Sequence, residues 1–220
     1  MIAALAAVTE VLKANQMEET ETNYFTTLIT SLESVDTDES MTAIVCLLAI
    51  IVKRMDESVL KSQSKKVTES LVNLLIKYMN SDHCALLRNL LKVMYPLLKV
   101  KAHWTETSQE LNVVLEFVTH HKPKVRRMAQ HIIRMLLIDD KPESSMVHPC
   151  ASLVAKFCIE KLESSAGLGK STPRVTFHAM QMLQEIICAF PTLSMKKCCE
   201  TIFKIMTLSS SVSIIFFHTY

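Results

Sequence analysis

Apolar residues recur at helical spacing along almost the whole chain. Positions three and four residues apart place one apolar stripe on a helix, whereas a half-buried strand alternates every second residue. Pro96 lies inside one such stretch, where its missing N–H should kink or end the helix. The pattern predicts helices near residues 2–15, 21–34, 38–54, 65–80, 83–99, 106–120, 123–138, 149–163, 174–190 and 193–208.

Polar and proline residues mark several of these boundaries. Asp38 and the pair Ser81-Asp82 precede predicted helices, as N-cap residues do. Pro123 and Pro173 stand at the first position of two others, where the missing N–H costs nothing. The boundaries therefore support separate helices rather than a few long ones.

The helices follow a long-range rhythm. Alternate helices start near residues 21, 65, 106, 149 and 193, which is 41 to 44 residues apart. The pattern P-[KR]-V-x3-A-x3-[IL] also occurs twice, beginning at Pro123 and at Pro173. Helix pairs at this period are typical of HEAT and armadillo repeats, in which neighbouring pairs stack to bury their apolar faces. The predicted fold class is therefore all-α, an α-solenoid of HEAT- or armadillo-type helix pairs whose second helices line the concave side.

Composition narrows the alternatives. The 220 residues include only 2 glycines, too few for the turns of strand-rich folds or for the glycine-rich loops of nucleotide-binding folds. The seven cysteines are odd in number and show no zinc-ligand spacing, which indicates small buried side chains in a reducing compartment. The longest uncharged apolar stretch, residues 41–52, is too short for a membrane span, so we expect an intracellular chain.

Charge is distributed unevenly although the net charge is only +2. Residues 1–40 carry 1 Lys against 8 Asp and Glu, whereas residues 41–140 carry 15 Lys and Arg against 9 acids. In that basic part, two predicted second helices place cations on one stripe, together with Tyr95 and His131, opposite their apolar face. The candidate binding residues are Arg88, Lys92, Lys99, Lys124, Arg127 and Arg134, and Lys53, Arg54 and Lys101 could extend the row.

This row has three interpretations. It could bind RNA phosphates through charge, or an acidic protein segment, or it could be a solvated helix face. Residues four positions after Arg88, Lys92, Lys124, Arg127 and Arg134 are not acidic, so no neutralising neighbour is expected on the same helix.

Other candidate chemistry is weak. The sequence G-K-S at 169–171 ends like a phosphate-binding loop, but Ser164 stands where the first glycine is required and no strand precedes it. Trp104 is expected to pack between repeats rather than stack on a base. We therefore expect no enzyme activity, cofactor, metal or small-molecule substrate. Three histidines lack the spacing of a metal site and are expected at the polar surface: His120, His121 and His131.

Six segments carry a family resemblance in order over residues 3–209. They are LAAVTEV at 5–11, ETETNYF at 19–25, HKPKVR with AQH at 121–131, AKFCI at 155–159, CAFP at 188–191 and MTLS at 206–209. They resemble the N-terminal HEAT region of ribosomal RNA-processing protein 12, the RRP12-like family.

The resemblance implies a non-enzymatic helical-repeat factor of ribosome biogenesis in the nucleus and nucleolus. Its implied partners are pre-ribosomal particle proteins and RNA, with roles in rRNA processing and subunit export. We expect residues 1–209 to form the HEAT-repeat region and residues 210–220 a tail that departs from the family. A generic HEAT adaptor or transport-receptor-like module that binds acidic proteins is the alternative.

Overall fold

The computed structural model describes residues 2–100, 108–139, 148–168, 173–190 and 200. Within them every regular element is helical, so the predicted all-α class is confirmed. The predicted helix 193–208, apart from residue 200, and the tail 210–220 lie outside the described residues. The helices are α1 (Ile2–Ala14), α2 (Glu21–Leu32), α3 (Asp38–Ile51), α4 (Glu57–Tyr78), α5 (Cys84–Lys99), α6 (Gln109–Glu116) with a 3-10 turn (Phe117–Thr119), α7 (Pro123–Arg134) with a π-helical turn (Met135–Asp139), α8 (Pro149–Leu168) and α9 (Pro173–Ala189).

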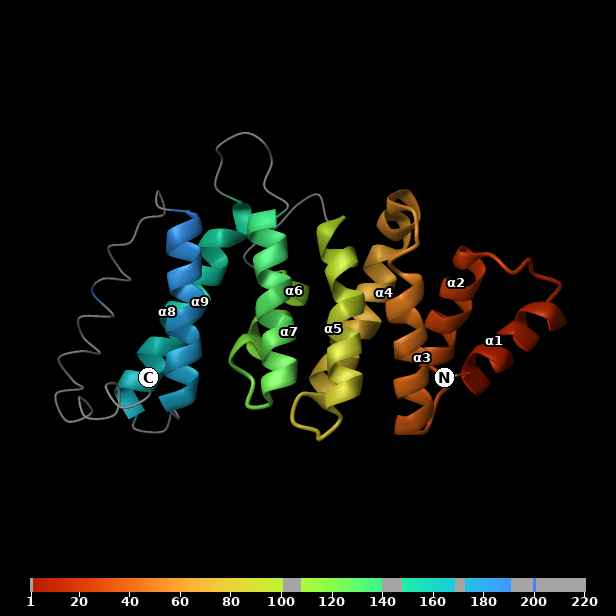
Figure 1. The fold of residues 1–220 in the computed structure, drawn as a ribbon, viewed down its shortest axis with the longest axis horizontal. Helices are drawn as coiled ribbons and strands as arrows, with labels where there is room; N and C mark the ends of the chain where they lie inside the picture. Colours follow the sequence, from red (N-terminus) through yellow and green to blue (C-terminus); the bar gives the residue numbers. More distant parts are fainter. Residues whose placement is uncertain (1, 101–107, 140–147, 169–172, 191–199, 201–220) are drawn as a thin grey trace.

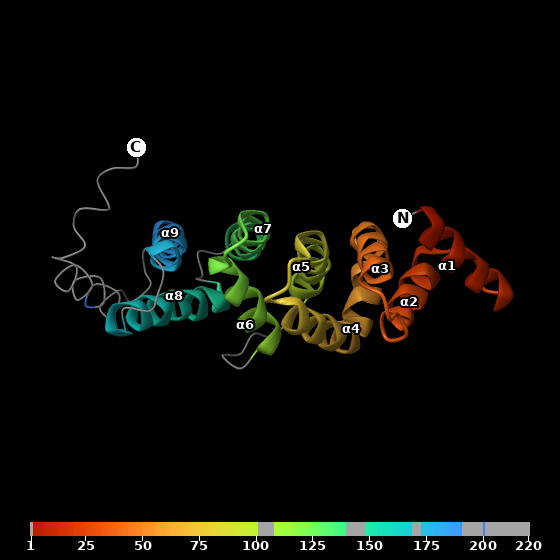
Figure 2. The same ribbon diagram turned by 90° about the horizontal axis from the view of Figure 1, so that it is seen from below.

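From α2 onward the helices form antiparallel pairs that stack in two layers (Figure 1). One layer holds α2, α4, α6 and α8, and the other holds α3, α5, α7 and α9 (Figure 2). The row is gently curved with the second layer on its inner side (Figure 2). Neighbouring pairs meet mainly through α3, α5 and α7 and through α4 and α6. This arrangement is the predicted stack of helix pairs, with the second helix of each pair on the inner side.

One continuous core runs through the stack from Val8 to Phe190. Its centre is α5, which contacts α3, α4 and α7 and whose apolar face is fully buried. No single pair could cover such a face, because each pair has only one partner helix of its own. The fully enclosed side chains of α5 are Leu86, Leu87, Leu90, Leu91, Val93 and Met94.

The repeated sequence pattern has the expected structural role. Pro123 and Pro173 are the first residues of α7 and α9. A backbone N–H at this position would have no acceptor within the helix, so its absence in proline breaks no hydrogen bond. Ala129 and Ala179, six residues later, are both completely buried, so their small side chains allow neighbouring helices to approach closely. The pattern therefore marks the start and the packing face of an inner-layer helix.

Helix α4 differs most from the sequence prediction. It begins at Glu57, eight residues before the predicted start at residue 65. The added turns contain only two large apolar side chains, Val59 and Leu60, so no apolar stripe marks them. Leu60 is nevertheless buried against the core, and this contact is enough to extend the helix.

Several predicted boundaries also need correction. The predicted end of α5 at residue 99 is confirmed: Pro96 does not end the helix, because only the carbonyl four residues earlier loses its donor. The N-cap of α3 is Thr37 rather than Asp38, and its side chain accepts from the backbone N–H of Ser40. The N-cap of α5 is His83 rather than the pair at 81–82. Helix α8 extends to Leu168, five residues beyond its predicted end.

Polar contacts join neighbouring repeats where α4 meets α5. The hydroxyl of Tyr78 donates a 2.5 Å hydrogen bond to Oδ1 of Asp38, at the start of α3. Nε2 of His83 lies 3.1 Å from the other carboxylate oxygen of Asp38. The hydrogen bond, with burial and the negative charge of Asp38 as smaller causes, raises the pKa of Tyr78 to about 12. The carboxylate therefore links two consecutive helix pairs.

Loss of this link should lower stability. Tyr78→Phe should reduce the free energy of unfolding by about 1 kcal/mol, the usual net value of a hydrogen bond. In an Asp38→Ala background the same change should cost much less, because the acceptor is already gone. Denaturant unfolding followed by circular dichroism measures the four proteins. An equal cost in both backgrounds would show that the hydroxyl contributes nothing through Asp38.

Candidate binding surface on the inner helices

Helix α7 carries half of the predicted basic row. Lys124, Arg127 and Arg134 are exposed along one side of the helix, together with His131. The opposite side is buried in the core through Val125 and further apolar residues. Because its polar and apolar side chains lie on opposite faces, α7 can expose these four side chains to solvent while its other face packs against α5.

Helix α5 carries the other half. Arg88, Lys92 and Tyr95 are half-buried on its surface, and Lys99 near its end is exposed. Because α5 and α7 are direct neighbours in the inner layer, their cations lie on adjacent helices of one surface (Figure 1). Lys53 and Arg54, in the turn after α3, are also exposed, whereas Lys101 lies outside the described residues.

The candidate cations differ in their electrostatic environment. Arg134 is not an isolated charge, because its Nε lies 3.5 Å from a carboxylate oxygen of Glu185 on α9. Glu185 belongs to the next repeat, so the spacing of charges along α7 alone does not indicate this ion pair. Within the described part of the chain, four of the candidates have no ion-pair partner: Arg88, Lys92, Lys124 and Arg127.

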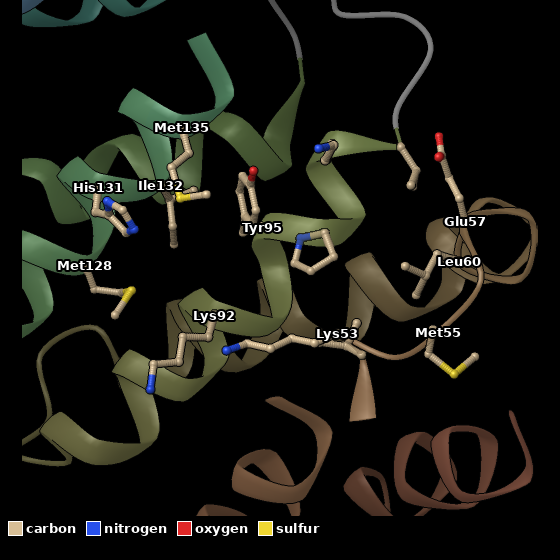
Figure 3. Close-up of a pocket in the computed structure, with 14 residues that line it drawn as sticks. Lys53, Met55, Glu57, Leu60, Lys92, Tyr95, Met128, His131, Ile132 and Met135 are labelled. Atoms are coloured by element: carbon tan, nitrogen blue, oxygen red, sulfur yellow. The ribbon is translucent and has the colours of Figure 1, made fainter. Parts of the chain in front are cut away.

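A groove lies beside these cations. It encloses about 520 Å³ between the α3–α4 turn, α5 and α7. Figure 3 shows Met128 and Ile132 of α7, with Met135 of the π-helical turn that follows, on one side and Met55 and Leu60 on the other. The sequence prediction missed this groove, since each of these residues reads as ordinary core from its spacing. The half-exposed methionines can be recognised as the lining of a groove only when the relative positions of the three elements are known.

Arg126 has a structural role in the turn before α7. Its side chain is 7% exposed, and its Nη1 donates to the backbone oxygens of His120 at 2.9 Å and His121 at 3.4 Å. Burial is the main cause that lowers its pKa, followed by the positive charges of Arg174 and Arg127. Arg126 is therefore a buried cation that stabilises the turn, whereas its neighbour Arg127 is exposed to solvent.

His120 is buried, contrary to the expected polar surface position. Its Nε2 lies 2.9 Å from the backbone oxygen of Met79, one repeat earlier, and its Nδ1 accepts from the backbone N–H of Lys122. Both contacts are satisfied by the neutral ring with hydrogen on Nε2. Burial is the main cause that lowers the pKa of His120. The ring therefore joins two repeats in its uncharged form.

Lys122 supports the same junction. Its ammonium donates to the backbone oxygen of Ser81 at 2.8 Å and to the carboxylate of Asp82 at 2.6 Å. The hydrogen bond from Lys122 lowers the pKa of Asp82. On the outer layer, Lys161 donates in the same way to Glu116. Lys122 and Lys161 thus connect neighbouring repeats and are not part of the candidate binding surface.

The structure describes only some of the weaker candidates. No group of three His, Cys, Asp or Glu side chains is arranged there to hold a metal ion. Gly167 lies inside α8, while the G-K-S sequence at 169–171 and Trp104 fall outside the described residues. Among the described helices, none combines the length and apolar character that a membrane crossing requires.

Stacked helix pairs, a continuous core and repeated inner-helix pattern define a helical-repeat protein of the HEAT type. The chain belongs to the RRP12-like family: its residues 1–215 match the family description "RRP12-like, N-terminal HEAT repeats". The resemblance found in the sequence is thereby confirmed.

Proteins named RRP12-like in three animals match most of the chain. The Gallus gallus protein is 36% identical over 218 residues, and the Homo sapiens protein is 33% identical over 214 residues. Each alignment covers 94% of this chain and 16% of the relative. The Drosophila melanogaster protein is 27% identical over 232 residues, which is 96% of this chain and 17% of that protein. The chain therefore spans about one sixth of the length of these relatives.

The difference between the two adjacent arginines can be tested. Arg126→Met removes a charged donor and leaves two turn carbonyls without it, so we expect a loss of about 2 kcal/mol of unfolding free energy. Arg127→Met makes the same change on an exposed side chain and should cost less than about 0.5 kcal/mol. Denaturant unfolding compares the two. Similar losses in both variants would contradict the structural role of Arg126.

Two histidines, the buried His120 and the half-buried His178, predict a pH dependence. Burial lowers the folded-state pKa of His120 and of His178, while the unfolded chain takes up a proton at the ordinary value of about 6.5. The unfolded state then binds more protons, so stability should fall as pH drops through about 6.5. His120→Gln should make this fall shallower between about pH 7.5 and about pH 5.5. Unchanged steepness would show that His120 does not contribute.

Proposed function

We propose that the chain is a non-enzymatic helical-repeat scaffold of ribosome biogenesis, which acts in pre-rRNA processing and in the maturation and export of pre-ribosomal subunits. Membership of the RRP12-like family supports the process, and the fold supports the scaffold role. Its partners would be proteins and RNA of the pre-ribosomal particle, and its place of action the nucleus and nucleolus.

One observation carries the proposed RNA contact. Arg88, Lys92, Lys124 and Arg127 stand on adjacent inner helices without an ion-pair partner in the described part of the chain. Exposed charges contribute little to the stability of a fold. A row of unpaired cations on one surface does, however, create a positive potential that attracts a polyanion such as RNA. Phosphate contacts of this kind position RNA and carry no sequence information.

A second function is supported by a different feature. A HEAT adaptor or transport-receptor-like module would bind acidic protein segments on the same inner layer. The apolar groove beside Lys92 favours this alternative, because phosphates alone gain nothing from an apolar floor.

The RNA contact predicts a steep salt dependence. Four phosphate contacts should give a slope of about −3 when the logarithm of the association constant is plotted against the logarithm of salt concentration. The reversal Lys124→Glu with Arg127→Glu should weaken binding to all single-stranded RNA sequences alike. Fluorescence anisotropy with labelled poly(U) and poly(A) 20-mers at several salt concentrations measures both effects.

The control reverses the same amount of charge on the outer layer. Lys65→Glu with Lys66→Glu changes two exposed lysines of α4 and should leave RNA affinity within about twofold. If the two double variants lose affinity equally, only net charge matters and the inner row is not an RNA site. Unchanged affinity in the α7 variant would favour a protein partner.

A further inference from the structure

The groove between the α3–α4 turn, α5 and α7 combines two kinds of surface. Its floor and walls are apolar and flexible, with three methionines at positions 55, 128 and 135 that are each half-buried. Unbranched methionine side chains adapt to irregular apolar partners and are common at binding surfaces that accept varied sequences. Its volume of about 520 Å³ lies in the usual range of sites that enclose a ligand.

Cations gather at one rim of this groove. Figure 3 shows the side chains of Lys53 and Lys92 extending along the same edge of the groove, although the two residues come from different repeats. Neither has an ion-pair partner in the residues that the structure describes. His131 stands on the α7 side, and the acid of the lining, Glu57, lies away from the lysine pair (Figure 3). Two like charges in one groove lining without a counter-ion leave a positive potential that an acidic group would neutralise.

The combination favours a peptide over RNA. An apolar floor strengthens binding only if the partner buries apolar side chains in it, and phosphates cannot do so without a loss of hydration. RNA could instead stack bases, but such sites present several large aromatic platforms, and this lining offers one phenol ring, Tyr95, and one imidazole, His131. A peptide with large apolar side chains and neighbouring Asp or Glu matches both the floor and the rim.

We propose that this groove is a docking site for a protein segment that inserts apolar anchor residues between Met128, Met135 and Leu60 and places acidic residues against Lys53 and Lys92. The negative part of the segment lies at the lysine rim and away from Glu57, which fixes its direction across the inner layer. This site deepens the proposed protein-binding alternative and rests on it. It shares Lys92 with the proposed RNA contact, whereas Arg88, Lys124 and Arg127 lie outside the groove.

Selection from a random 12-residue peptide library on the 220-residue chain tests the chemistry. Enriched peptides should combine large apolar residues with Asp or Glu close by. Enrichment of basic peptides, or of acidic peptides without apolar residues, would overturn the proposal.

Variants then test the place. Met128→Gln with Met135→Gln makes the wall polar without a change of charge, and Lys53→Glu with Lys92→Glu reverses the rim. Each pair should weaken the best selected peptide by about tenfold or more in fluorescence anisotropy. Lys65→Glu with Lys66→Glu is the control for the rim and should change affinity by less than about twofold. Circular dichroism confirms that each variant keeps its helical content.

Parallel titration with poly(U) 20-mer separates the two proposals. The neutral methionine pair should reduce peptide binding and leave RNA binding unchanged. Loss of RNA affinity in that pair would assign the groove to RNA and overturn the peptide site. Peptide affinity that survives both groove variants would place the peptide elsewhere and would equally overturn it. Neither result depends on whether Lys124 and Arg127 bind RNA.

Discussion

Burial of one apolar face by several neighbours is the constraint on which this structure depends. Leu86, Leu90 and Leu97 of α5 are each almost fully enclosed, and α3, α4 and α7 all contribute to that enclosure. A buried leucine contributes about 1.5–3 kcal/mol, whereas an exposed ion pair contributes about 1 kcal/mol at most. The stack therefore holds without help from its surface cations, and α5 and α7 can present them to a partner.

The sequence predicts those features of the fold that depend on residues close together in the chain. Periodic apolar residues and the first-position prolines identify the inner helices, because helix geometry alone relates those positions. The early turns of α4 escape prediction, since Leu60 acquires its helical context only by packing against distant residues. The choice between Arg126 and Arg127 is similar: both read as basic, and the carbonyls of the preceding turn decide which one is buried.

The candidate surface shows the same division. The exposure of Lys124 and Arg127 follows from their position opposite Val125. The pairing of Arg134 with Glu185 could not be seen, because the two residues belong to successive repeats. The groove was likewise invisible, as its lining comes from three elements whose relative positions no single helix specifies. Features formed by residues of different repeats can therefore be identified from the structure but not from the sequence pattern of a single helix.

The side-chain contacts between neighbouring repeats have a consequence for folding kinetics. The bond of Tyr78 to Asp38 spans 40 residues, and that of Arg174 to His121 spans 53. Each contact closes a loop of about one repeat, so the loop-closure entropy stays nearly constant along the stack. Folding can then propagate from any formed helix pair to the next. Because the contacts are close in sequence, the contact order is low and no pairing between distant segments is needed first. A chain emerging during synthesis could dock each new repeat on the one before it.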